Sequence, residues 1–195
     1  MANVFDVADY FIELFGQELG SDITNLKLNK LLYYAQGHCL ATTSQPLFQD
    51  AIEAWEYGPV VPAIYQRYNV CGKHPIEAQG KCVNHALTEK ERSLLLDVAC
   101  EMGRFSASYL FGKTHEVGTP WFQTKRNDAI DTFVLKKYFK TSIQIPTLSE
   151  VVQKSIDSPM GRVAEDGAVI LPAEEYDPAD DICWCGEGDC WCCDE

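Results

Sequence analysis

The sequence is short of positive charge, and its basic residues stop well before its last residue. It contains 16 Lys and Arg against 29 Asp and Glu, a formal net charge of −13. Residues 165–195 hold 11 acidic residues and neither Lys nor Arg, so this segment carries −11 and residues 1–164 carry −2. Direct nucleic-acid binding is disfavoured because nothing resembles a basic surface for phosphates. The acidic segment instead favours a basic partner surface or a solubilising role.

Long hydrophobic runs are missing as well. No stretch approaches the ~20 apolar residues that a membrane-spanning helix needs. The first eleven residues also lack the basic region and the uninterrupted apolar run of a secretory signal. We therefore expect a cytoplasmic protein without a membrane partner. Its 195 residues, 46% of them hydrophobic, are enough for one good core but leave little room for a second large domain.

The cysteines do not form a pattern typical of a disulfide framework, because their number is odd and the expected compartment is reducing. Four of them lie apart from each other and are expected to pack as small buried hydrophobes: Cys39, Cys71, Cys82 and Cys100. The other five fall within eleven residues: Cys183, Cys185, Cys190, Cys192 and Cys193.

This second group has two interpretations that the residues leave open. Four thiolates can bind a tetrahedral zinc ion, and Gly186 and Gly188 would let the segment between the pairs turn back. The Cys-x-Cys spacing is, however, tighter than the usual Cys-x2-Cys. In the alternative interpretation these residues form a reduced, solvated and oxidation-prone tail.

The periodicity predicts an α+β fold that is predominantly α-helical. We expect a single compact helical domain over 1–161 with a small two- or three-stranded β element, followed by an acidic cysteine-rich tail over 162–195. Helices are expected at 4–19, at 25–41, from 62, from 88, from 106 or 108 to about 115, at 132–139 and at 147–157. Short strands are expected near 52–55, bounded by Gly58 and Pro59, and near 81–85, and a turn is expected at 118–121.

For two of these helices the sequence predicts which residues are buried. In helix 25–41 the buried stripe is predicted to consist of Leu28, Leu31, Leu32, Ala35 and Cys39. The side chains of Lys27, Lys30 and Gln36 are predicted to face outward. In helix 132–139 the predicted core positions are Phe133, Leu135 and Phe139.

Three blocks of sequence are more distinctive than ordinary core positions. The first is LKLNKLLYYAQG at 26–37, and the second joins PLF at 46–48 to IEAWEYGPVVP at 52–62 and Tyr65. The third is looser and runs from Ser108 to Trp121, with Lys113-Thr-His115 and Pro120-Trp121 inside it. On these residues the chain resembles the Panacea antitoxin domain family, which includes SocA-type antitoxins and phage-associated GepA-like proteins. The resemblance covers roughly residues 5–140 and does not extend to the tail.

The resemblance implies an α-rich domain that binds and neutralises a partner toxin, or a phage-encoded inhibitor that binds a host defence protein. It also implies that such a protein can act as an adaptor that hands its toxin to a protease. The partner-binding candidates are Tyr33, Tyr34, Trp55, Tyr57, Tyr65, His115, Trp121, Trp184 and Trp191. The aromatic residues among them can equally be core residues, which is the commoner role of such side chains.

The residues also allow two function classes other than an antitoxin. A metal-binding regulatory or proteolytic-adaptor module would work through the cysteine-rich tail, with zinc as its cofactor. A small hydrolase would use His115 and Glu116, with His38 as a further acid–base candidate. Because no nucleophile stands at a recognisable spacing from these residues, we predict no catalytic residues and no enzymatic activity. His115 is instead expected to hydrogen-bond a neighbouring backbone group.

Overall fold

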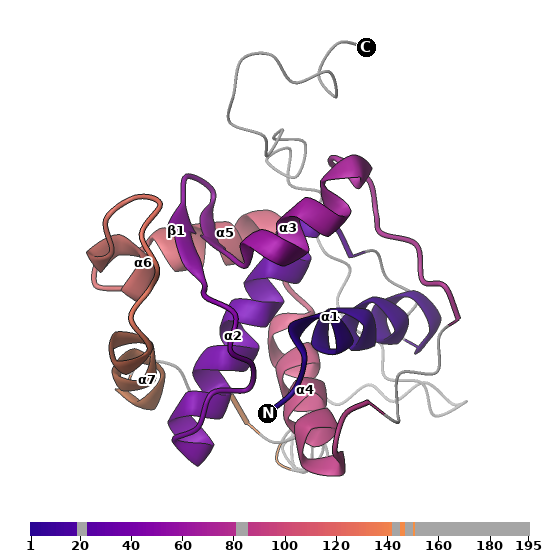
Figure 1. The fold of residues 1–195 in the computed structure, drawn as a ribbon, viewed down its shortest axis with the longest axis horizontal. Coiled ribbons are helices and arrows are strands. Elements are labelled where there is room, and N and C mark those ends of the chain that lie inside the picture. The colour runs from indigo at the N-terminus through magenta and orange to yellow at the C-terminus, as the bar shows by residue number, and fades with distance from the viewer. Residues whose placement is uncertain (19–22, 81–85, 142–144, 147–149, 151–195) are drawn as a thin grey trace, which may run out of the picture.

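The computed structural model describes residues 1–18, 23–80, 86–141, 145–146 and 150. This part of the chain is predominantly α-helical and contains a small two-stranded antiparallel sheet, which confirms the predicted fold class (Figure 1). The expected strand at 81–85, the expected helix at 147–157 and the tail at 162–195 lie outside the described residues. None of the helices within the described ranges is long and apolar enough to cross a membrane.

The elements follow one another along the chain much as the periodicity predicts. They are α1 (Val4–Glu13), the π-helical turn η1 (Leu14–Glu18), α2 (Asn25–Thr43), β1 (Glu53–Trp55), β2 (Gly58–Val60), α3 (Pro62–Tyr68), the 3-10 turn η2 (Asn69–Cys71), α4 (Glu89–Met102), α5 (Ala107–His115), α6 (Pro120–Gln123) and α7 (Thr132–Thr141). Helix α4 begins where it was expected, and Thr88 and Glu91 form a capping box at its start. The expected turn at 118–121 continues into the single turn of α6, which Thr119 caps.

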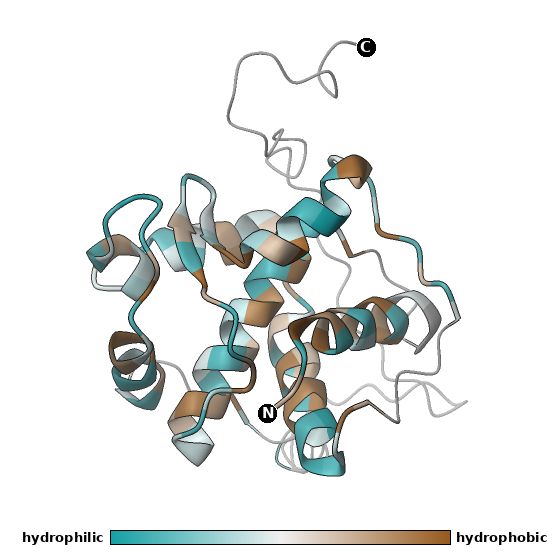
Figure 2. Ribbon diagram, in the orientation of Figure 1, coloured by the Kyte–Doolittle hydropathy of each residue, from teal (hydrophilic) through white to brown (hydrophobic). Residues whose placement is uncertain are grey.

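Helix α2 runs through the middle of the fold. It packs against α1 and α4 on one side, against α7 on another, and against α3, α5 and β2 at its N-terminal half (Figure 1). Hydrophobic residues recur along α2, α1 and α4 where these helices face each other (Figure 2). The predicted stripe is confirmed, because Leu28, Leu31, Leu32 and Ala35 have no exposed surface and Cys39 is buried.

The prediction that α2 has an outward polar face is wrong. Lys27, Lys30 and Gln36 are all buried, and Lys30 has no exposed surface. The reason is that neighbouring elements surround α2, so Lys30 and Gln36 bind backbone groups in place of water, and the ammonium of Lys27 lies over the ring of Phe15. Gln36 shows this best: its Nε2 donates to the carbonyl of Phe48 at 3.0 Å, and its Oε1 accepts from the amide of Leu47 at 2.8 Å.

The two strands form a hairpin in which Trp55 is opposite Gly58 and Glu53 is opposite Val60. Gly58 and Pro59 therefore belong to β2 and do not merely end the first strand, as the sequence had suggested. Pro59 is tolerated because a two-stranded sheet has edges that need no amide donor. On its other side β1 contacts the segment before α7, where the amide of Ile130 donates to the carbonyl of Ile52 at 2.7 Å.

Helix α7 is amphipathic, and two of its three predicted core positions are confirmed. Leu135 and Phe139 are buried against α2. Phe133, by contrast, is 73% exposed, so its assignment to the core is wrong. Phe133 is two residues from Leu135, which at 3.6 residues per turn places the two side chains on opposite sides of the helix.

Candidate partner-binding site

Five of the predicted site residues come together at one corner of the molecule. Trp55 and Tyr57 come from the hairpin, Tyr65 from α3, His115 from α5 and Trp121 from α6. The rings of Trp55 and Tyr65 are 5.0 Å apart, and those of His115 and Trp121 are 3.7 Å apart. The indole Nε1 of Trp121 donates to the carbonyl of Trp55 at 2.7 Å. We call these five half-buried residues the aromatic corner.

His115 joins α5 to the turn of the hairpin. Its Nδ1 lies 2.7 Å from the carbonyl oxygen of Phe111, one helical turn earlier, and its Nε2 lies 3.1 Å from the carbonyl oxygen of Glu56. The imidazole packs between the rings of Phe111 and Trp121, at centroid distances of 3.9 and 3.7 Å. The expectation that His115 bonds to neighbouring backbone is confirmed.

The turn of the hairpin is fixed from inside by Lys30. Its ammonium donates to the carbonyl oxygens of Tyr57 and Pro59, the latter at 3.3 Å. Burial lowers the pKa of Lys30 well below its usual value. Gly58 between these carbonyls has φ +100°, and a Cβ there would come within 2.5 Å of Lys30 Nζ and 2.9 Å of the Thr114 hydroxyl. Only glycine fits this position without strain.

Thr119 completes the frame of the corner. Its hydroxyl donates to the carbonyl of Thr114 at 2.7 Å and accepts from the amide of Phe122 at 3.2 Å, which caps α6. Lys30, Gly58 and Thr114 come from the three separate sequence blocks that carry the family resemblance. The fold therefore brings all three blocks to a single turn.

The groups considered for acid–base chemistry are held in other contacts. The carboxylate of Glu116 is 2.8 Å from the ammonium of Lys113. Both ring nitrogens of His115 face backbone carbonyl oxygens. His38 lies on α2, away from the corner, and burial lowers its pKa. The corner can offer a partly exposed aromatic surface in a fixed geometry, which suits recognition of another molecule.

Comparison with known proteins shows which family this region resembles. Residues 28–122 match the family described as "Antitoxin SocA-like, Panacea domain". Antitoxin SocA of Caulobacter vibrioides is 34% identical to the chain over 109 residues, which are 51% of this chain and 58% of that relative. The chain thus spans less than two thirds of the length of this relative. No solved structure matches the chain.

The whole aromatic corner lies inside the matched residues 28–122, whereas α1 and α7 lie outside them. Two predicted partner residues of the matched range, Tyr33 and Tyr34, are not part of the corner. They are 1% and 3% exposed and pack edge-on against Phe139 of α7, at 5.4 and 5.8 Å. Burial raises the pKa of both phenols. These two tyrosines join α2 to α7.

Sequence reasoning missed two aromatic residues beside the corner. Phe111 packs on His115, and the signal for it was its position four residues earlier on the same helix face. Phe122 follows Trp121 on α6 and is 52% exposed, which no sequence pattern indicated. Trp184 and Trp191 lie outside the described residues, as do the cysteines of the tail: Cys183, Cys185, Cys190, Cys192 and Cys193.

The scattered cysteines are only partly as expected. Cys39 is buried, whereas Cys71 and Cys100 are half-buried, and Cys82 lies outside the described residues. Burial raises the pKa of the Cys39 and Cys100 thiols, so both favour the protonated form. The surroundings of Cys39 and Cys100 are therefore those of side chains that pack in the protein interior.

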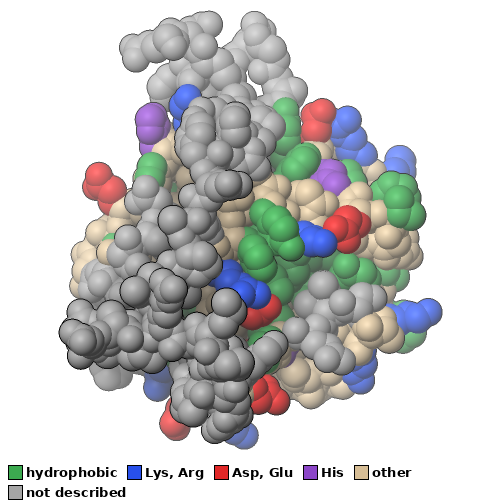
Figure 3. All heavy atoms as spheres, turned by 180° about the vertical axis from the view of Figure 1, so that it is seen from behind, with side chains coloured by type: hydrophobic (Ala, Val, Ile, Leu, Met, Phe, Trp, Pro, Cys, Tyr) green, Lys and Arg blue, Asp and Glu red, His purple; other side chains and the backbone are tan. Residues whose placement is uncertain are grey.

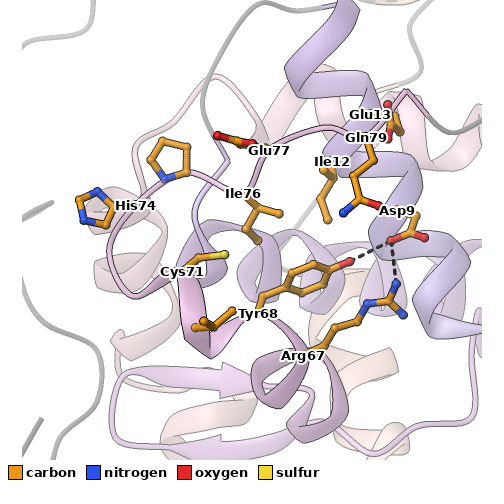
Figure 4. Close-up of a pocket in the computed structure, with 12 residues that line it drawn as sticks. Asp9, Ile12, Glu13, Arg67, Tyr68, Cys71, His74, Ile76, Glu77 and Gln79 are labelled. Carbon is orange, nitrogen blue, oxygen red and sulfur yellow. Dashed lines mark hydrogen bonds and ion pairs between the residues drawn. The ribbon is translucent and has the colours of Figure 1, made fainter. Parts of the chain in front are cut away.

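A pocket of about 480 Å³ lies between α1, α3 and the segment that follows η2 (Figure 4). On its wall the hydroxyl of Tyr68 donates to Asp9 at 2.8 Å, and Arg67 lies 3.9 Å from the same carboxylate. Glu13 accepts from the backbone amides of Gln79 and Gly80, at 2.8 and 3.1 Å. On this wall Tyr68 and Arg67 therefore join α3 to α1, and Glu13 holds Gln79 and Gly80 against α1.

Proposed function

We propose that this chain is an antitoxin-like protein that binds a partner toxin and neutralises it by stoichiometric contact. The observation that supports this is the match to the Panacea domain family at 28–122, together with 34% identity to a protein named Antitoxin SocA. The alignment covers 58% of that relative, so the support applies to the matched region. Such a function needs a rigid recognition surface and no catalytic group.

We place the toxin contact at the exposed edge of the aromatic corner, on Trp55, Tyr57, Trp121 and the adjoining Phe122. Large aromatic side chains that are already fixed lose little conformational entropy on binding, and they dominate the energetics of many interfaces. Here the hydrogen bond from Trp121 to the carbonyl of Trp55 and the contacts of His115 hold the surface in place. Tyr33 and Tyr34 act as scaffold in this proposal because they are buried.

Co-expression tests the proposal. Each gene next to the one that encodes this chain would be expressed with and without it, and growth and co-purification would be measured. We expect one neighbouring product to be toxic alone, harmless with this chain, and bound to it at a one-to-one ratio. If no neighbouring product forms a complex and growth is never rescued, the antitoxin proposal fails.

The place of contact is tested with a matched pair of surface variants. Phe122→Ser removes an exposed ring beside the corner, and Val70→Ser removes an exposed apolar side chain on η2. We expect Phe122→Ser to weaken toxin binding by about tenfold or more, as loss of a central aromatic contact does, and Val70→Ser to leave it unchanged. Equal affinities for both variants would move the interface away from the corner.

A second candidate function rests on the tail. Five cysteines within eleven residues favour a metal-binding regulatory or proteolytic-adaptor module, with zinc held by thiolates. Elemental analysis of the full chain purified without added zinc tests this. We expect about one zinc ion per chain, and we expect it to be lost when the tail cysteines are changed to serine. Less than one ion per several chains would contradict the metal-binding hypothesis.

A further inference from the structure

The outward side of α7 is an unusual surface for a helix of this protein. Phe133 is 73% exposed, and Lys137 and Lys140 follow it at i+4 and i+7, with the half-buried Lys136 beside them. We call these four residues the α7 outer face. Leu135 and Phe139 fix the opposite side of the helix in the core, so the outer face is presented in a defined orientation.

Charge is divided unevenly between this region and the rest of the chain. Residues 113–141 contain six Lys and Arg against three Asp and Glu, whereas residues 1–112 contain eight against thirteen. Lys113 and Arg126 are held in ion pairs with Glu116 and Glu56. The lysines of the α7 outer face make no ion pair within the described ranges. Seen from behind, the edge formed by α6 and α7 shows basic and hydrophobic side chains side by side (Figure 3).

We propose that the α7 outer face is the docking surface for residues 165–195 of the same chain. That segment has the complementary chemistry: it carries −11, contains no Lys or Arg that could neutralise it internally, and includes Trp184 and Trp191. Its carboxylates pair with the α7 lysines. Its indoles contact the exposed ring of Phe133 and make cation–π contacts with lysine ammonium groups.

The linker between α7 and residues 165–195 is long enough to let the acidic segment reach the α7 outer face, and short enough to keep the two close. Residues 142–164 separate α7 from the acidic segment, and 23 residues can span at most about 75–80 Å. The outer face of a ten-residue helix is only about 15 Å long. A short tether gives an effective concentration in about the millimolar range, which favours this intramolecular occupant over a second copy of the chain. The inference does not depend on the proposed antitoxin function.

Zero-length carbodiimide crosslinking of the full chain tests the contact directly, because it joins a lysine to a carboxylate only when the two are paired. At low salt we expect crosslinked peptides that connect 132–141 with 165–195 in the monomer fraction. They should be lost at about 1 M salt, where the Debye length is about 3 Å. Crosslinks spread evenly over all surface lysines would overturn the proposal, as would α7 crosslinks found only in dimers or none at all.

A pair of charge variants separates this surface from general electrostatics. Lys137→Glu with Lys140→Glu reverses two charges of the outer face, and Lys73→Glu with Lys90→Glu reverses two exposed charges elsewhere. We expect the first pair to reduce the crosslink to the remaining Lys136 by about fivefold or more, because each lost pairing weakens docking, and the second pair to preserve it. Equal loss with both pairs contradicts the proposal.

Phe133→Ser tests the aromatic part of the contact while leaving every charge in place. Its readout is cleavage of the acidic segment by a protease specific for acidic residues, measured on the folded full chain. We expect cleavage about threefold faster or more than in the parent chain, since docking protects the segment. Val117→Ser, at an 84% exposed position, is the matched control and should not change the rate. Unchanged cleavage in Phe133→Ser would overturn the role of the ring.

Discussion

Helices α2 and α7 pack against each other, yet they use their polar residues in opposite ways. In α2 the side chains of Asn29, Lys30 and Gln36 are buried and bind backbone groups of other segments. In α7 the lysines lie on the side away from the core, and the buried residues Leu135 and Phe139 lie on the side that packs against α2. A polar residue in a helix can therefore mark either the solvent side or the place where a loop is held.

The difference lies in what surrounds each helix. Among the described elements, five helices and β2 pack around α2. The segments between them contain backbone groups that bond to α2 side chains, such as the amides of Leu47 and Val61. A buried backbone group without a partner costs about 1–3 kcal/mol, so polar side chains that reach these groups stabilise the fold. Among the described residues, helix α7 packs against α2 and α6 and follows the ordinary amphipathic rule.

The largest expected effect separates the two sides of α7. Phe139→Ala should lower the free energy of unfolding by about 3–5 kcal/mol, because it leaves a cavity against Tyr33 and Tyr34. Phe133→Ala is the matched control, and its effect should stay within about 0.5 kcal/mol since the ring is 73% exposed. Urea unfolding of both variants measures the difference. Similar losses in both would mean that α7 is not anchored as described.

The next effect tests the polar residues of α2. Gln36→Leu should destabilise the protein by about 2–4 kcal/mol, because the amides of Leu47 and Phe48 and the carbonyl of Phe48 lose their partner. Gln66→Leu, at an exposed position of α3, makes the same chemical change and should be nearly neutral. Thermal unfolding followed by circular dichroism compares them. If Gln36→Leu melts with the parent protein, the burial of polar groups in α2 does not stabilise the loop.

A smaller effect probes how closely α2 and α7 approach. Gly37→Ala should cost about 1–3 kcal/mol, because the added methyl group overlaps the ring of Phe139. Gly112→Ala on α5 is the control, since a Cβ there meets no atom within 4 Å and alanine favours a helix. The double variant Gly37→Ala with Phe139→Leu should recover part of the loss. Additive losses in the double variant would argue against a direct contact.

The smallest effect is a pH dependence that comes from Lys30. Its pKa is lowered by burial, so between the folded value and the unfolded value of 10.5 the unfolded chain binds more protons. The contribution of Lys30 to the free energy of unfolding therefore rises with pH between its folded and unfolded pKa values. It is smallest at lower pH, where the lysine is charged in both states. Urea midpoints between about pH 7 and 10 should rise more steeply in the parent protein than in Lys30→Met. Lys30→Gln provides a second variant that can still donate to the hairpin turn. Parallel curves for all three proteins would contradict a lowered pKa.

Much of the architecture could be predicted because it depends on local rules. The capping box at Thr88, the proline at the start of α3 and the spacing of Leu135 and Phe139 each act within a few residues. The family resemblance also selected the aromatic residues that meet at the corner. It could not separate Trp55 and Trp121, at the corner, from Tyr33 and Tyr34, because exposure depends on the packing of α7.

The amino-acid sequence was enough to predict the helical class, most element positions, a family resemblance over roughly residues 5–140 and the separation of a nearly neutral body from an acidic segment. Local propensity, short-range spacing and composition are sufficient for these. Tertiary structure alone decided that Lys30 and Gln36 are buried and that Phe133 is exposed. It also decided that three separate blocks meet at one hairpin turn. Such outcomes depend on which surfaces far apart in the chain cover each other, and no local pattern records that.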